Sequence, residues 1–352
     1  MLVKTYASAV QGVEAQTITV EINAGGEVRD GKDYFNLVGL PDNAVREGFA
    51  RIEAAIKNIG MRVIRVKLVV NLAPADLRKE GSSYDLPIAI GLLASTKQMK
   101  FDELDKYVFM GELSLDGGLR PIKGALPIAI QARKEGYKGL FLPKENAREA
   151  AIVNNLEVYG IENLKEAVDF FNKKKELEPV VVDTRSIFED TQDVYSVDFS
   201  DVKGQENIKR ALEIAAAGGH NVILIGPPGA GKTMLARRLP TILPPLSLHE
   251  ALETTKIHSV SGMLPANSAL VSTRPFRSPH HTISDVALVG GGSNPMPGEI
   301  SLSHNGVLFL DELPEFKRTV LEVMRQPMEE RKVTISRAKI TVDYPASFML
   351  VA

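Results

Sequence analysis

The chain has 352 residues, of which 44% are hydrophobic, and this length indicates two domains, each with enough apolar side chains for a core. A formal net charge of −2 excludes a globally basic nucleic-acid binder, so any contact with nucleic acid must be local. The chain contains no cysteine, which excludes disulfides and thiolate metal sites and is compatible with a reducing cytoplasm.

Targeting and membrane segments are not evident in the sequence. The N-terminus lacks the long apolar core of a signal peptide, and the best apolar run, Leu86–Ala94, is far shorter than a membrane span. We therefore expect a cytoplasmic protein that has no membrane partner.

Residues 1–172 alternate between strand-like and helical patterns, which is typical of an α/β or α+β domain. Asp42 precedes a helical pattern whose apolar residues step by three or four positions and which stops at Gly60. A tight hairpin turn is expected at residues 116–118. The other predicted strands and helices are two strands within Tyr6–Ile22, then Tyr34–Val38, Val63–Leu72, Leu86–Leu93, Gly124–Ala132, Lys138–Leu142 and Asn163–Phe171.

Two stretches of this domain, Gly111–Ile122 and Gly139–Asn146, resemble the proteolytic domain of Lon-type proteases. The resemblance implies a Lon-like α+β fold of the ribosomal S5 domain 2-like type. In that family a serine in a G-P-S-A-G turn is activated by a lysine in a P-I-G-G-L-K turn, which must be neutral enough to act as a base.

The Ser–Lys pair is not intact in this chain. Ser82 and Ser83 lie near the first site, but Leu126 occupies the position of the lysine, and Lys123 is displaced by three positions. A serine without its base is an ordinary hydroxyl, so we expect a scaffold or interaction role rather than peptidase activity.

Residues 173–195 mix a charge run with one proline and show no sustained helical period, so we interpret them as a linker, although Val180–Val182 could pair with another strand. Residues 196–352 form the second domain. Its opening, Asp198–Gln205, resembles the segment that covers the adenine in AAA+ ATPases, with Gly204 and Gln205 in the usual place.

The apolar run Val222–Ile225 leads into a glycine-rich turn and then into a helical pattern, which predicts strand, phosphate loop and helix. The turn fits G-x-x-x-x-G-K-[ST], whose backbone N–H groups cradle phosphate oxygens. Lys232 would contact the β- and γ-phosphates, and Thr233 would bind Mg²⁺. The residues expected to bind ATP are Gly226, Pro227, Pro228, Gly229, Ala230, Gly231, Lys232, Thr233, Met234 and Gln205.

Arg274–Ser284 and Val289–Asn305 closely resemble the YifB/ComM family of magnesium-chelatase-like AAA+ ATPases. The resemblance covers both domains, and it implies that this stretch builds an insertion in the second helix of the ATPase core. His280 and His281 invite a metal interpretation, but no carboxylate at ligand spacing accompanies them. A turn stabilised by Arg274 and Arg277 explains them better.

A carboxylate pair follows the apolar strand Gly306–Leu310. Asp311 would bind Mg²⁺ through water, and Glu312 would polarise the attacking water. Lys232 and Glu312 are therefore the predicted catalytic residues, and Thr233 and Asp311 the predicted metal ligands. The alternative is an acidic pair at the start of a helix, where the helix dipole favours carboxylates. The intact phosphate loop in the same chain favours the catalytic interpretation.

Phe316–Glu330 predicts a helix up to Pro327, and Lys332–Val342 alternates like a β-hairpin. Related minichromosome-maintenance helicases carry a basic residue into a central channel on such a hairpin. Arg337 and Lys339 are therefore our candidate nucleic-acid contacts, and a solvated hairpin tip is the alternative.

The family resemblance implies a ring-forming motor that uses ATP and Mg²⁺ to move DNA in recombination or natural transformation.

 

We expect a homo-oligomer, a hexamer in the full-length protein, with DNA as its partner and no tetrapyrrole. Two alternatives stay open, namely a chelatase motor subunit that drives metal insertion and a protein-unfolding chaperone. In the family, the strand Phe348–Ala352 leads into a sensor asparagine, an arginine finger and a helical lid. We therefore expect an α/β chain, a Lon-like domain followed by most of a P-loop AAA+ core, truncated before the lid.

Overall fold

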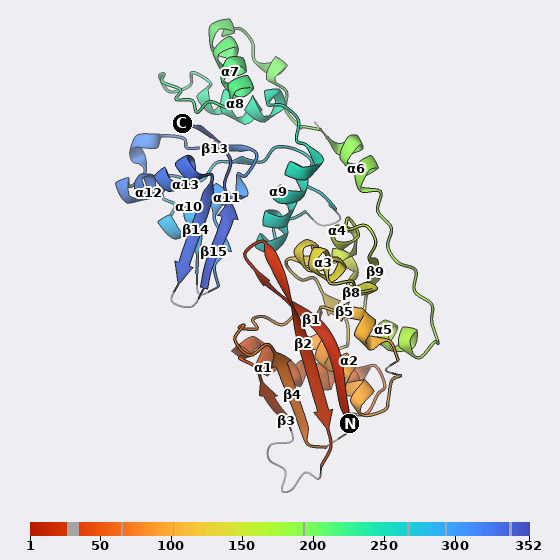
Figure 1. Ribbon diagram of the computed structural model, residues 1–352. Coiled ribbons are helices and arrows are strands. Elements are labelled where there is room, and N and C mark those ends of the chain that lie inside the picture. Colours follow the sequence, from red (N-terminus) through yellow and green to blue (C-terminus); the bar gives the residue numbers. More distant parts are fainter. Residues whose placement is uncertain are drawn as a thin grey trace. The chain divides into compact units, whose positions relative to one another are not determined.

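The computed structural model describes residues 1–26, 35–64, 66–100, 102–192, 194–265, 268–292, 294–337 and 340–352. The chain divides into two compact units (Figure 1). The first comprises residues 1–182 and 265–269, and the second comprises residues 183–264 and 270–352. None of the described helices is long and apolar enough to cross a membrane.

Within the described residues of the first unit, one mixed sheet has the strand order β3-β4-β2-β1-β5-β8-β9. The long β1–β2 hairpin is antiparallel, whereas β5, β8 and β9 run parallel to one another. The strands are β1 Leu2–Gln11, β2 Glu14–Ala24, β3 Phe35–Val38, β4 Leu68–Ala73, β5 Tyr107–Phe109, β8 Gly139–Pro143 and β9 Glu157–Ile161. A separate two-stranded ribbon joins β6 Glu112–Leu113 to β7 Leu119–Arg120.

Helices pack on this sheet as the apolar pattern predicts. The helices of the first unit are α1 Asn43–Asn58, α2 Asp85–Ser95, η1 Leu104–Lys106, α3 Ala125–Lys134, α4 Lys144–Ala150 and α5 Leu164–Phe171. The Asp42 side chain caps α1 by accepting a hydrogen bond from the Val45 N–H over 2.8 Å. α2 is buried along its whole length and contacts β1 and β2, and Gly91 permits this approach because a Cβ there would meet the Ile22 side chain.

One expectation for this unit needs correction. The predicted strand Val63–Leu72 begins only at Leu68, because its partner β2 ends at Ala24, which pairs with Leu68. Tyr34 lies outside the described residues. Val180 does pair, since its N–H donates to the Val158 carbonyl over 2.8 Å.

The second unit begins with α6 Thr184–Thr191, a helix that the sequence did not suggest and that is capped by Asp183. Its other helices are η2 Phe199–Asp201, α7 Glu206–Gly218, α8 Lys232–Arg238, η3 Leu239–Ile242, α9 Leu248–Ser261, α10 Asp285–Val289, α11 Glu299–Leu302, η4 Leu313–Glu315, α12 Arg318–Glu322 and α13 Arg325–Glu330. The predicted helix Phe316–Glu330 is thus two short helices, and Pro327 lies within the second helix and does not end it. Pro327 has no N–H to donate to the Val323 carbonyl, so one helical hydrogen bond is missing at Val323, where the two helices are interrupted.

Three parallel strands, in the order β10-β13-β16, form the centre of the second unit within its described residues. They are β10 Phe276–Arg277, β13 Val307–Phe309 and β16 Met349–Val351. Two hairpins accompany them, β11 Gly290–Gly291 with β12 Met296–Pro297, and β14 Lys332–Arg337 with β15 Ile340–Pro345. The short β11–β12 ribbon lies between α10 and α11, in the place where the family resemblance implied an insertion.

Candidate nucleotide site

The segment that precedes the glycine-rich loop runs beside β16. The Val222 N–H donates to the Leu350 carbonyl over 2.9 Å, and the Leu224 N–H donates to the Ala352 carbonyl over 2.7 Å. Val222 forms a parallel bridge with Val351, but residues 223–225 form no strand, so the predicted strand Val222–Ile225 is reduced to this one bridge. The loop 226–231 therefore leaves this sheet at the same edge as the residues that follow β13.

The loop itself has the backbone that its glycines permit. Gly229 and Gly231 have φ values of 79° and 85°, in the left-handed region that side chains disfavour, and α8 begins directly afterwards at Lys232. The Lys232 ammonium donates to the carbonyls of Gly226 at 2.8 Å and Pro227 at 3.1 Å. The positive charge therefore lies over the loop that would hold phosphate.

Thr233 and Asp311 meet across the sheet edge. The Thr233 hydroxyl donates to Asp311 Oδ2 over 2.8 Å, and Asp311 Oδ1 accepts the backbone N–H of Glu312 at 3.1 Å. A hydroxyl and a carboxylate are hard oxygen ligands, which suit Mg²⁺ together with water and phosphate oxygens. The donor set thus fits the metal that the sequence predicts.

Glu312 follows Asp311 in a left-handed conformation with φ 56°, which is uncommon for a residue with a side chain. Its side chain is 69% exposed, and its Oε2 lies 3.8 Å from Nδ1 of His281. The carboxylate is therefore accessible to water and has a neighbouring imidazole.

Gln205 brings the opening segment to the loop. It has φ 59° at the start of α7, and its side-chain amide donates to the Ala230 carbonyl over 3.3 Å. Arg238 at the end of α8 pairs with Asp201 at 3.2 Å, which ties the same segment to the helix after the loop. Gly226–Met234, Gln205, Asp311 and Glu312 are thus joined in one region of the second unit.

The interpretation of the histidine turn is wrong in one respect. Arg277 forms two short hydrogen bonds with Glu299, at 2.5 and 2.6 Å, and Arg274 donates to the carbonyls of Pro244 and Asn305. Arg277 therefore holds the start of α11, and Arg274 holds two loops. The contact between His281 and Glu312 could not be predicted from the sequence, because it joins the ends of two different strands.

Arg337 lies exposed at the end of β14, next to the β11–β12 ribbon. A Cβ atom on Gly291 would lie 3.1 Å from Arg337 Nη2, so the guanidinium lies close against a glycine backbone. The Tyr344 hydroxyl donates to the Pro295 carbonyl over 2.8 Å, which links the two hairpins. Lys339, the second predicted contact, lies outside the described residues.

Of the two serines in the first unit, Ser82 faces a carboxylate. The Ser82 hydroxyl donates to Glu112, and the Ser83 carbonyl accepts the Gly111 N–H at 2.8 Å. Leu126 is fully buried, and its backbone N–H donates to Glu149 over 2.9 Å. The contacts of Ser82, Ser83 and Leu126 are therefore structural, since they connect neighbouring segments of the backbone.

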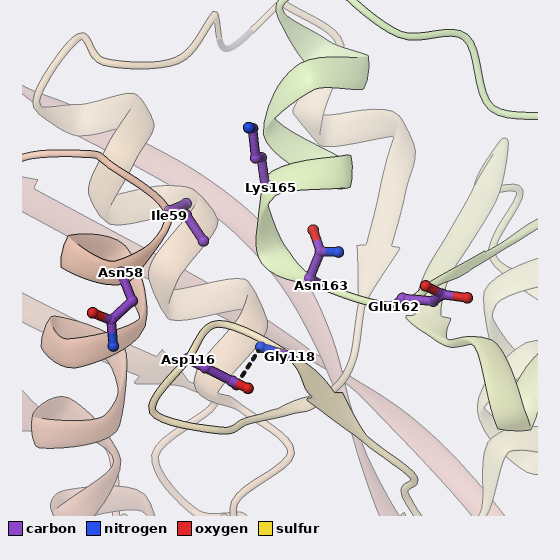
Figure 2. A pocket seen from close by; sticks show the side chains of 7 residues that line it. All are labelled: Asn58, Ile59, Asp116, Gly118, Glu162, Asn163 and Lys165. Carbon is purple, nitrogen blue, oxygen red and sulfur yellow. Dashed lines mark hydrogen bonds between the residues drawn. The ribbon is translucent and has the colours of Figure 1, made fainter.

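A hollow of about 450 Å³ lies elsewhere in this unit, and Figure 2 shows its lining. Polar side chains from the end of α1, the β6–β7 turn and the start of α5 surround it. The lining residues are Asn58, Ile59, Asp116, Gly118, Glu162, Asn163 and Lys165. Asp116 accepts the Gly118 N–H at 3.0 Å, so this carboxylate is used to hold the turn.

Comparison with known protein families gives two matches. Residues 198–352 match the family described as magnesium chelatase, subunit ChlI, and residues 24–146 match the family described as subunit ChlI of Mg-chelatase. Apart from residues 265–269, the first of these matches falls in the second unit, and the other falls in the first unit.

Individual relatives match almost the whole chain. This chain is 44% identical to the competence protein ComM of Haemophilus influenzae over 348 residues. The aligned region covers 99% of this chain and 67% of ComM. The chain is 46% identical over 354 residues to YifB of Escherichia coli, covering 99% and 66%. Lon protease 2 of Bacillus subtilis is 32% identical over 150 residues, covering 40% and 26%. The chain thus spans about two thirds of the length of ComM and YifB.

Proposed function

Because the chain belongs to the YifB/ComM family of magnesium-chelatase-like AAA+ ATPases, we propose that it binds ATP and Mg²⁺ at Gly226–Thr233 and uses hydrolysis to remodel DNA. In this proposal the full-length protein forms a ring, most simply a hexamer. The Lon-like unit, residues 1–172, serves as a scaffold, and residues 196–352 are the ATPase core.

The chemistry assigned to each side chain follows from its place. Lys232 leaves the loop carbonyls to contact the β- and γ-phosphates. Thr233 would hold Mg²⁺ directly and Asp311 would hold it through water, and the ion would neutralise charge on the phosphates. Glu312 orients the attacking water and accepts its proton.

One observation carries the ATPase proposal: the hydrogen bond between Thr233 and Asp311 joins the end of the phosphate loop to the carboxylate after β13. Two oxygens suited to Mg²⁺ are therefore already adjacent. No such pairing would be needed if the glycine turn were merely structural.

The experiment measures ATP turnover and ATP binding in the full-length protein. Glu312→Gln should keep nucleotide affinity and reduce kcat by about 100-fold or more, since a general base contributes about 10²–10⁴-fold. Glu315→Gln, a change of an exposed glutamate nearby, should have no effect. Equal turnover in Glu312→Gln and the unchanged protein would refute the assignment.

DNA as the substrate is supported by two observations. One relative is named a competence protein, and a DNA repair protein, RadA of Listeria monocytogenes, is 29% identical over 110 residues, covering 30% of this chain and 24% of that protein. The second is the exposed guanidinium of Arg337 at a hairpin end. In a ring, each subunit contributes one copy of this arginine, and together these copies can bind DNA phosphates although the chain is net acidic.

A chelatase motor is the second candidate, because both matching families are described as magnesium chelatase subunits. It predicts ATPase activity that responds to a tetrapyrrole-binding partner and is indifferent to DNA. A protein unfoldase is the third, suggested by the similarity to Lon protease 2. It predicts stimulation by unfolded protein, so one ATPase titration with each ligand separates the three.

A further inference from the structure

His281 and Glu312 meet because two parallel strands end at the same edge of the sheet. β10 and β13 pair in parallel, with Arg277 opposite Leu308. The segments after both strands therefore leave at the carboxyl edge, where His281 Nδ1 lies 3.8 Å from Glu312 Oε2. Small rotations of either side chain bring this distance to that of a hydrogen bond.

The imidazole is held more firmly than the carboxylate. Its ring lies 4.0 Å from the ring of His280 and 6.4 Å from that of Phe316, measured between centroids. His280 is itself fixed by a 2.9 Å hydrogen bond between its Nδ1 and the Thr282 hydroxyl. The His281 side chain is 30% exposed, compared with 69% for Glu312.

Glu312 has little else to fix it. Within the part of the chain that the structure describes, His281 is the one basic side chain at ion-pair distance from its carboxylate. Lys232 is occupied by the carbonyls of Gly226 and Pro227. A long, exposed glutamate side chain samples several rotamers unless a neighbour selects one.

We propose that His281 is a positioning residue that orients the Glu312 carboxylate for attack by water. This rests on the ATPase function proposed above. Nδ1–H donates to Oε2, which leaves Oε1 to accept the proton of the attacking water. A carboxylate that is misplaced by about 1 Å can lose on the order of 100-fold in rate, so fixing one rotamer matters.

The test compares three substitutions in the full-length protein by steady-state ATPase kinetics and by binding of a fluorescent ATP analogue. His281→Phe keeps the ring packing but has no donor, and it should lower kcat about tenfold to 100-fold with little change in nucleotide affinity. His281→Asn retains a donor near the Nδ1 position and should recover most of the rate. His281→Ala should resemble His281→Phe.

A distant histidine provides the matched control. His249 lies 3.6 Å from Glu253 on the exposed face of α9, and His249→Phe should leave kcat unchanged. In a Glu312→Gln background, adding His281→Phe should cause no further loss, because the two residues act as one unit.

Each contrary outcome is distinct. Wild-type kcat in His281→Phe, or an equal loss in His281→Asn and His281→Phe, overturns the positioning role while the ATPase function stands. A further loss in the Glu312→Gln background overturns it too. A wild-type protein that does not hydrolyse ATP overturns both proposals.

Discussion

The Thr233 hydroxyl donates a 2.8 Å hydrogen bond to Asp311, although the two residues lie 78 positions apart in the chain. One follows the phosphate loop and the other follows β13, so parallel strands bring them together. The contact places a hydroxyl and a carboxylate oxygen side by side, next to Lys232. These are the oxygens that would hold Mg²⁺, Thr233 directly and Asp311 through water.

Lys232→Ala should weaken ATP binding by about tenfold to 100-fold, since hydrogen bonds to charged groups contribute about 1.5–3 kcal/mol. The substitution removes the charge that faces the β- and γ-phosphates. Lys134→Ala, which removes an exposed lysine of the Lon-like unit, should bind ATP normally. Titration of a fluorescent ATP analogue checks both, and equal affinities for the two variants would rule out the phosphate site.

Arg337→Ala in the full-length protein should keep ATP binding but lose DNA-stimulated turnover. The affinity for DNA should fall, and its dependence on salt should become shallower, because fewer counterions are released. Arg318→Ala removes an exposed arginine that already pairs with Glu322, and it serves as the control. Fluorescence anisotropy at several salt concentrations gives the slope. An unchanged slope in Arg337→Ala would assign DNA contact elsewhere.

Neither Ser82→Ala nor Ser83→Ala should alter any catalytic activity. Leu126 cannot act as a base, and the Ser82 hydroxyl is bound by Glu112. Incubation with a serine-reactive acylating probe, followed by mass spectrometry, should find no labelled residue at either position. Labelling of Ser83 that disappears in Ser83→Ala would instead indicate an activated nucleophile.

Asp85 should make the stability of the Lon-like unit depend on pH. Its side chain is 2% exposed, and burial raises its pKa from 3.8 to about 6, an effect that the ion pair with Arg51 at 2.8 Å only partly offsets. The folded state therefore binds the proton more tightly than the unfolded state. Stability from this group is present below pH 4 and is lost as the pH rises through 6.

Urea unfolding between pH 4 and 7 measures this effect. Relative to Asp85→Asn, the unchanged protein should lose stability across that range, by on the order of 3 kcal/mol for a pKa change of about two units. Asp105→Asn, at an exposed position, should follow the unchanged protein. Parallel curves for the unchanged protein and Asp85→Asn would contradict the raised pKa.

Local signals in the sequence located much of the fold. α1 begins after the Asp42 cap as predicted, because capping is a short-range interaction. α6 was missed, because it is short and buries only Phe188, which leaves almost no periodic pattern. The early end of β2, which delays the start of β4, depends on pairing between distant residues and has no local signal.

The candidate site likewise contains parts that local sequence signals predict and parts that depend on contacts between distant residues. The glycine pattern predicts the loop 226–231 and its proposed phosphate contacts, because the residues concerned are consecutive in the chain. The neighbour of Glu312 could not be found this way, since His281 belongs to another strand end. The parallel strand order was the missing information, because it decides which loops share an edge.

The most direct test of DNA remodelling is a strand-displacement assay with forked and four-way DNA, using the full-length protein with ATP and Mg²⁺. The unchanged protein should displace strands, and Glu315→Gln should do the same. Glu312→Gln should bind DNA and ATP but displace nothing, because only water activation is lost. ATP hydrolysis without displacement of any strand, or displacement that persists in Glu312→Gln, would contradict an ATP-driven DNA motor.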